Sequence, residues 1–420
     1  MIVDFLSYIA IRIATFPFAF LPIKMIHIIG NFLGTVIYHL SPKFRKRALS
    51  NLALASSLHL QEEDIKRIAK ESLQNLCITC LEYAKLGREK HITDIATCTT
   101  PEEPLTILNQ GKGIIFFCGH QSNWEILFLE GSSRMPGTAI ARPIKNAFLY
   151  KWIVSIREKY SGKIITRKNA AKEGLRAIKQ GRFLGVVGDQ GMPDSPFSSL
   201  FFGRLAWTSP LPAILACKTG CPVFVAMTKR QNNKYITHYS HAIWPNKEEP
   251  VEKEIERIMK EVLSILEKSI EESPGEWLWS HNRWKQQTLE KVNRTFRQDC
   301  IAIVLPKEKK DFEMFYEALS TFEKIYPREF ISVFIPKNFM NLEIPKNWEK
   351  IPYETEEDLF VRDFRFKLVF NFSGVRKLKS HFTSLSAFTV FSLRDIQKIA
   401  KVPDDTPIPQ TLTKAMIKCQ

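Results

Sequence analysis

A potential proton acceptor and a carboxylate stand five positions apart in the stretch His120-Gln121-Ser122-Asn123-Trp124-Glu125. A histidine whose ring is held by an acidic side chain is a general-base unit, because the carboxylate fixes which ring nitrogen carries the proton. Residues five apart on one regular helix point about 140° away from each other. His120 is therefore expected to precede a helix, with Glu125 in its first turn and folded back onto one imidazole nitrogen.

The surroundings of this motif separate it from a chance match. At this composition about one His-x4-Asp/Glu spacing is expected by accident, and His59 with Asp64 supplies a second copy. That copy opens a charged amphipathic segment and fits an ordinary helix start. His120 instead follows the apolar run Gly113–Gly119, which predicts a buried strand that ends in a turn, where α/β folds place their chemistry.

Asp189 and three arginines form a second group with chemical potential. Asp189 follows the apolar run 183–188, so it is expected at the same end of the sheet as His120, either orienting an arginine or the substrate or serving as a turn or helix-capping residue. Arg142, Arg157 and Arg167 carry guanidinium forks that suit phosphates and carboxylates, and one of them is a candidate donor to a developing oxyanion, besides backbone N–H groups near the turn.

The elements that must position these residues alternate along the chain. Apolar runs predict strands at 113–118, 138–141, 163–166, 183–188 and 222–227. Helical spacing predicts helices at 61–86, 122–134, 147–160, 170–180, 210–219 and 248–272. This alternation indicates an α/β fold with a mixed sheet and flanking helices.

A new series of predicted strands and helices begins near residue 297. Four further strands are predicted at 300–305, 330–335, 367–372 and 387–391, with helical segments near 311–325, 356–360 and 394–401. We expect three parts: membrane-associated helices over 1–40, a catalytic domain over 41–296, and a small α/β domain of unknown role over 297–420.

The N-terminus predicts attachment to a membrane. Between Phe5 and Ile23 only Arg12 is charged, a second apolar stretch covers 25–40, and four basic residues follow within 43–47. Arg12, Pro17 and Pro22 are awkward in a spanning helix, so spanning and interfacial placements both remain open, as does a buried core helix. The basic residues place the main body on the cytoplasmic side.

Composition limits the partners. The 420-residue chain has a net charge of +16, which favours acidic partners such as nucleic acid, anionic lipid or an acidic carrier protein, or reflects a merely basic surface. Its eight cysteines are scattered and lack zinc-site spacing, so we expect no metal and a reducing compartment.

Several blocks in order resemble one family. They are, in order, the motif of His120 to Glu125, the stretch 142–146, Arg157, Arg167-Lys168, Gly188-Asp189-Gln190, Phe201-Phe202-Gly203 and the block 276–285. Through these blocks the chain resembles the late lipid A acyltransferases, the lauroyl/myristoyl type within the lysophospholipid acyltransferase superfamily. The stretch 191–195 and Thr208-Ser209-Pro210 depart from the family pattern, and the resemblance ends near residue 290.

The resemblance implies a glycerolipid acyltransferase-like fold and a reaction. A fatty acyl group would pass from an acyl carrier protein thioester to a hydroxyl of a Kdo-bearing lipid A precursor, at the cytoplasmic face of a bacterial inner membrane. His120 and Glu125 would be catalytic, and Arg142, Arg157, Arg167, Asp189 and Gln190 would bind substrate. No cofactor is expected because the thioester is already activated, and anionic membrane rather than nucleic acid is the expected surface.

Other functions are compatible with the same residues. The acceptor could be another glycolipid, a glycerophosphate or a lysophospholipid, and the same pair acting on water would give a hydrolase. A non-enzymatic membrane-bound or nucleic-acid-binding scaffold would explain the charge and the apolar terminus, yet it would leave the ordered series of blocks unexplained.

Overall fold

The computed structural model describes residues 1–286 and 292–418. Residues 287–291, at the end of the expected catalytic domain, and residues 419–420 lie outside the described part. The chain forms two compact units. The first comprises Met1–Ser41, Gln61–Gln190 and Ser195–His281. The second comprises Pro42–Leu60, Gly191–Asp194 and Asn282–Gln420, so it takes in a segment that the sequence placed with the catalytic domain.

A seven-stranded sheet forms the centre of the first unit, in the order β1-β9-β8-β2-β5-β3-β4. The strands are β1 (Ala96–Cys98), β2 (Ile114–Cys118), β3 (Gly137–Ala141), β4 (Gly162–Thr166), β5 (Phe183–Val187), β8 (Val223–Gln231) and β9 (Lys234–Tyr239). Neighbouring strands are parallel except β8 and β9, which form an antiparallel pair. The expected mixed α/β sheet is confirmed, and its middle strand β2 is buried along its whole length.

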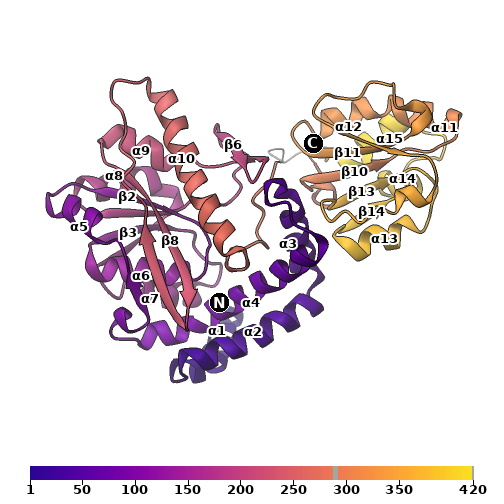
Figure 1. Cartoon of the computed structure of the whole chain (residues 1–420). Helices are drawn as coiled ribbons and strands as arrows, with labels where there is room; N and C mark the ends of the chain where they lie inside the picture. The colour runs from indigo at the N-terminus through magenta and orange to yellow at the C-terminus, as the bar shows by residue number, and fades with distance from the viewer. Residues whose placement is uncertain (287–291, 419–420) are drawn as a thin grey trace. The chain divides into compact units, whose positions relative to one another are not determined.

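Helices cover the sheet on its faces (Figure 1). They are α5 (Glu102–Asn109), α6 (Trp124–Arg134), α7 (Ala147–Arg157), α8 (Ala170–Lys179), α9 (Leu211–Thr219) and α10 (Val251–Glu272). Helix α9 contacts α8 and α10, whereas α6 contacts α7. A short hairpin of β6 (Ser198–Phe201) and β7 (Arg204–Trp207) holds the Phe-Phe-Gly block at its turn.

Two N-terminal helices lead into a long amphipathic helix. Segments Ile2–Ala19 and Ile23–Leu40 are long and apolar enough to cross a membrane by length and composition. Helix α1 (Ile2–Thr15) has no buried residue among those described, whereas α2 (Ile23–Leu40) packs along α4 (Glu62–Arg88). The outward side of α2 keeps apolar side chains exposed, including Phe32 at 67%.

Glycines on α2 allow its close approach to α4. A Cβ atom on Gly34 would lie 2.3 Å from the Cα atom of Gln74, and one on Gly30 would lie 2.5 Å from Cγ1 of Ile78. Contacts this short cannot exist, so only glycine permits the two backbones to pack at this distance. The pairing leaves α2 with one face on the protein and one face outward.

Arg12, the charge that looked out of place in an apolar helix, has partners on the protein. Its guanidinium lies 4.7 Å from the ring centroid of Trp152 on α7 and donates to the hydroxyl of Tyr8 at 3.1 Å. Phe5 packs edge to face on Phe148, also on α7. Helix α1 is therefore attached to α7 through aromatic and cation–π contacts.

The second unit is built on a parallel five-stranded sheet in the order β12-β11-β10-β13-β14. Its strands are β10 (Cys300–Val304), β11 (Phe330–Pro336), β12 (Glu349–Tyr353), β13 (Leu368–Asn371) and β14 (Thr389–Phe391). Its helices are α11 (Lys309–Glu317), α12 (Leu319–Ile325), α13 (Leu378–Leu385), α14 (Leu393–Ala400) and α15 (Ile408–Met416). The sequence predicted four of these strands and missed β12, an edge strand that tolerates Pro352.

Helix α3 (Pro42–Leu54) belongs to this second unit, although it lies between α2 and α4 in the chain. The Lys46 ammonium donates to the carbonyl of Ala387 at 2.8 Å, and Lys367 donates to Oδ1 of Asn51 at 2.9 Å. All three of these side chains are buried, so the helix is held by polar contacts away from water.

Replacing Gly34 by alanine is expected to destabilise the protein by about 1–3 kcal/mol, because the added methyl group must push α2 away from α4. Gly87 is the matched control, since a Cβ there meets only side-chain atoms of Ile156 at 3.4 Å and beyond. Gly87→Ala should be neutral or stabilise by up to about 1 kcal/mol through helix propensity. Thermal unfolding of both variants in the same detergent measures the difference, and equal midpoints would contradict the close packing of α2.

Candidate active site

His120 lies in a tight turn between β2 and α6. The turn passes through Ser122, whose φ of 49° is in the left-handed region that non-glycine residues rarely adopt. Asn123 caps α6, because its side-chain oxygen accepts from the backbone N–H groups of Glu125 at 3.0 Å and Ile126 at 3.4 Å. His120 therefore precedes the helix, as the sequence predicted.

The partner of the His120 ring is Asp189, which follows β5. Nδ1 of His120 lies 2.7 Å from Oδ1 of Asp189, and the backbone N–H of His120 donates to Oδ2 at 2.7 Å. The indole N–H of Trp277 donates to the same Oδ2 at 2.8 Å. Because an ionised carboxylate only accepts, Nδ1 carries the proton and Nε2 is left as the basic nitrogen.

This pairing corrects the expectation that Glu125 folds back onto the His120 ring. The Glu125 carboxylate instead accepts two hydrogen bonds from Arg157, at 2.6 Å from Nη2 and 2.7 Å from Nε, and a further bond from the hydroxyl of Tyr83. Because Asn123 is the capping residue, Glu125 sits within the first turn of α6 and points toward α4 and α7 rather than back over the turn.

Close backbone approach makes the His120–Asp189 contact possible. A Cβ atom on Gly119 would lie 3.1 Å from Oδ2 of Asp189, and one on Gly188 would lie 2.1 Å from the ring of Phe117. The adjacent parallel strands β2 and β5 pair Cys118 with Val187, so both strands end level with each other. Two glycines after level strand ends therefore bring the carboxylate against the backbone of His120.

Burial and charge act in opposite directions on these groups. Burial alone would lower the pKa of His120, but the Asp189 charge, its hydrogen bond and the Glu125 charge raise that pKa above its usual 6.5. Burial would raise the pKa of Asp189, and the His120 contact outweighs it and holds the pKa far below its usual range. Arg157 likewise overcomes the effect of burial on Glu125 and lowers its pKa. Both carboxyl groups are thus ionised at neutral pH.

The Nε2 side of the ring faces aromatic and amide groups. The Trp124 ring packs edge to face on His120 at 4.8 Å between centroids, and the His281 ring does so at 5.6 Å. The side-chain nitrogen of Gln190 lies 3.5 Å from Nε2 of His120. The His120 side chain keeps 16% of its surface exposed, so Nε2 is at an accessible edge of the site.

His120, Asp189 and His281 also meet the distance condition for a shared metal ion, since one potential ligand atom of each lies within 4.8 Å of the others. The carboxylate of Asp189 is already engaged by two donors of His120 and one of Trp277, which occupy three of its roughly four acceptor positions. This geometry is that of a hydrogen-bonded relay, which favours proton transfer over metal ligation.

The Trp-rich block 276–285 is hydrogen-bonded to the backbone of the turn that carries His120. The carbonyl of Glu276 accepts from Ser122 N–H at 2.7 Å, and the N–H of Leu278 donates to the carbonyl of His120 at 3.0 Å. Trp277 and Trp279 are fully buried, so they pack in the core and do not form a membrane-interface surface. The block therefore holds the turn that carries His120 in place.

Arg142 and Arg167 lie at the same edge of the sheet as His120. Arg142 follows β3 and Arg167 follows β4, and both strands run parallel to β2 and β5. Both side chains are exposed, but β3 and β4 are two and three strand positions away from β2, so Arg142 begins about 10 Å away along the sheet. Arg157 was expected to bind substrate, but its guanidinium fork is bonded to Glu125.

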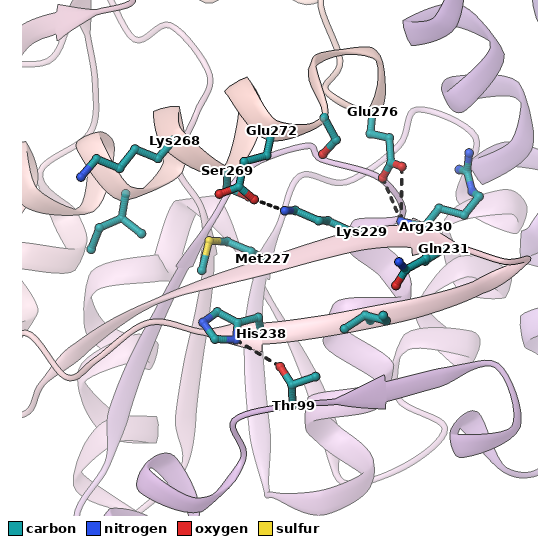
Figure 2. Close-up of a pocket in the computed structure, with 13 residues that line it drawn as sticks. Thr99, Met227, Lys229, Arg230, Gln231, His238, Lys268, Ser269, Glu272 and Glu276 are labelled. Carbon is teal, nitrogen blue, oxygen red and sulfur yellow. Dashed lines mark hydrogen bonds and ion pairs between the residues drawn. The ribbon is translucent and has the colours of Figure 1, made fainter.

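A groove of about 650 Å³ lies beside the turn, between β8, β9 and the end of α10 (Figure 2). His238 and Thr99 hydrogen-bond on one side of it, and Lys229 pairs with Glu272 on the other. Ser269 lines the groove and also bonds through its hydroxyl to the side chain of Gln121 at 3.0 Å. The groove therefore borders the residue next to His120 without containing the His120–Asp189 pair.

Several site residues escaped the sequence analysis. Tyr83, Asn123, Trp277 and His281 contact the pair or its supports, yet each lies in a stretch that reads as helix, turn or core. The one usable signal was the family-like block 276–285, which contains both Trp277 and His281. The asparagine before the helix could also have been read as a cap from its type alone.

Arg157→Ala is expected to lower the free energy of unfolding by about 3–5 kcal/mol, because it leaves the buried Glu125 carboxylate without its cation. Glu125 is 3% exposed. Arg67→Ala is the control, since Arg67 pairs with Asp64 on the surface at 2.8 Å and should cost at most about 1 kcal/mol. Adding Glu125→Gln to Arg157→Ala should recover part of the loss. Chemical denaturation measures all three, and an Arg157→Ala protein as stable as Arg67→Ala would contradict a supporting ion pair.

Comparison with known proteins assigns most of the chain to one family. A sequence model described as bacterial lipid A biosynthesis acyltransferase matches residues 2–286. A search of curated proteins found no match. The matched region contains His120, Glu125, Asp189 and the block around Trp277, and it ends before the second sheet begins. The chain therefore belongs to the bacterial lipid A biosynthesis acyltransferase family.

Proposed function

We propose that this protein transfers a fatty acyl group from an acyl carrier protein thioester to a hydroxyl of a Kdo-bearing lipid A precursor. The observation that carries the proposal is the bond of 2.7 Å between Nδ1 of His120 and Asp189, which leaves Nε2 free as a base beside an accessible edge. A hydroxyl has a pKa far above 7, so it needs such a base when it attacks.

In the proposed reaction His120 acts first as a base and then as an acid. Nε2 of His120 takes the proton of the acceptor hydroxyl while the oxygen attacks the thioester carbonyl. Asp189 stabilises the imidazolium that forms, as carboxylates do in other acyl-transfer sites. The tetrahedral intermediate then collapses and the carbon–sulfur bond breaks. Nε2 donates the proton that it took from the hydroxyl to the leaving thiolate of the carrier. The hydroxyl is acylated, the carrier leaves as a thiol, and His120 ends neutral.

The acceptor's charge suits the basic edge of the site. Lipid A precursors carry phosphate groups, and guanidinium forks bind phosphate through paired hydrogen bonds. Arg142 and Arg167 are exposed at the edge that carries His120. Gln190, whose amide lies 3.5 Å from Nε2, is close enough to contact the attacking hydroxyl. We assign these three residues to binding of the acceptor, whereas Arg157 holds Glu125 in place.

The N-terminal helices support attachment to the membrane where the acceptor resides. Helix α1 and the outer side of α2 expose large apolar side chains, among them Ile2, Ile13, Ile28 and Phe32. An exposed apolar surface on helices that also pack on the protein suits a helix lying in the membrane interface. With basic residues following at 43–47, we place the body at the cytoplasmic face of the inner membrane. A net charge of +16 suits an acidic carrier as donor.

His120→Ala is expected to abolish acyl transfer while the protein stays folded, because a positioned base contributes roughly 10²-fold or more. Release of the carrier thiol and mass spectrometry of the acylated precursor measure the reaction, and far-UV circular dichroism checks the fold. A variant that keeps more than about a tenth of the rate would refute His120 as the base. Release of free fatty acid by the wild-type protein without an acceptor would indicate a hydrolase instead.

The pH dependence of kcat/KM is expected to rise through an apparent pKa above 6.5, because His120 acts only when neutral and Asp189 raises its pKa. Asp189→Asn removes the charge and leaves burial, which lowers the pKa of the ring. The rise should therefore move to lower pH while the plateau falls by about 10²-fold or more. Glu125→Gln should shift the rise less, since Glu125 is bonded to Arg157. A rise unmoved by Asp189→Asn would contradict the pairing.

A further inference from the structure

A buried carboxylate outside the proposed catalytic pair ties three elements of the first unit together. Glu82, in the middle of α4, is 2% exposed. Its oxygens accept from the Tyr235 hydroxyl at 2.7 and 2.8 Å, from Nδ2 of Asn123 at 2.6 Å, and contact Nε2 of His27 at 2.8 Å. These partners come from β9, the catalytic turn and α2. A buried carboxylate with donors on three elements fixes their relative positions.

The contact with Asn123 reaches the catalytic turn directly. One end of the Asn123 side chain caps α6 and the other end donates to Glu82, so Glu82 determines where the cap sits. The cap determines where α6 begins, and His120 is three residues before it. The same face of α4 also holds the turn through Asn75 and Thr79, which donate to the carbonyl of Ser122 at 3.0 and 3.2 Å.

The contact with His27 extends the link to the helix that faces outward. His27 lies on the inner side of α2, 6% exposed, and its other ring nitrogen lies 3.2 Å from Oδ1 of Asn233. Helix α2 packs closely on α4 through Gly30 and Gly34 and exposes apolar residues on its other side. A continuous set of hydrogen bonds thus runs from α2 through Glu82 to the cap of α6.

We propose that Glu82 is a positioning residue of the acyl-transfer site, which sets the place of the His120 turn through Asn123 and ties it to α2 through His27. This inference rests on the proposed function. Correct seating of α2 on α4 is then a condition for the geometry of the catalytic turn. Small misplacements of a reacting group remote from the mutated residue can cost about 10²-fold in rate, so the link should be visible in turnover.

Reversing the polarity of the Asn123–Glu82 bond tests the proposal. Asn123→Asp keeps a good helix cap, because aspartate caps as well as asparagine, but it sets a carboxylate against Glu82. The expected result is a loss of kcat of about tenfold or more with KM for the donor within about twofold. Adding Glu82→Gln supplies an amide donor to the new carboxylate, so the double variant should recover most of kcat. Thermal midpoints of both proteins show that they fold.

The α2 end of the link is tested by His27→Ala against Gln74→Ala. Both residues lie at the α2–α4 contact, but Gln74 donates to Thr35 on α2 at 2.9 Å, and among the described residues no hydrogen bond links its side chain to the turn. We expect His27→Ala to lower kcat and Gln74→Ala to leave it unchanged. Combined with Asn123→Asp, His27→Ala should add less than its own separate loss, since both act on one network.

A readout independent of turnover separates this proposal from the proposed function. The rate at which diethyl pyrocarbonate modifies His120, followed by mass spectrometry, should rise in Asn123→Asp and return in the double variant. Wild-type kcat and labelling in Asn123→Asp, or a double variant as impaired as the single one, would overturn the role of Glu82. Retained transfer in His120→Ala would overturn the base assignment, while the labelling result would still decide whether Glu82 positions the turn.

Discussion

The hydrogen bond between Nδ1 of His120 and Oδ1 of Asp189 joins the ends of two adjacent parallel strands, and much of the first unit is arranged around it. It depends on β2 and β5 ending level, and glycine at 119 leaves room for it, because a Cβ there would lie 3.1 Å from the Asp189 carboxylate. Trp277 completes the surroundings of the carboxylate by donating its indole N–H. The short segments that directly follow two paired strands therefore determine which nitrogen of the ring carries the proton.

Two buried carboxylates near the turn, those of Asp189 and Glu125, have different cationic partners. Asp189 is stabilised by His120, whose charge can change, whereas Glu125 is stabilised by Arg157, whose charge is permanent. A buried acid paired with a permanent cation contributes stability and a constant field. The motif of His120 to Glu125 thus joins a residue that pairs with Asp189 to one that pairs with Arg157.

Much of the first unit could be predicted from periodicity, because its strands are apolar runs and its helices carry regular apolar spacing. The position of His120 before a helix followed from the same reasoning. Its partner could not be predicted, since Asp189 is 69 positions away and meets His120 only because β5 lies next to β2. Strand order is a property of the folded sheet that local patterns do not carry. Asp189 was expected at this edge, but its contact with the ring was not.

Helix α3 has a consequence for how the chain is put together. It lies within residues 2–286, the part that matches the family, yet its buried Lys46 and Asn51 are bonded to Ala387 and Lys367, which precede β14 and β13 of the second unit. Without these partners the two polar groups would lose their hydrogen bonds, so α3 and the rest of the second unit are expected to open and close as one cooperative unit. Residues after 286 therefore complete the surroundings of α3, and a cut at the end of the family match would divide a single folding unit.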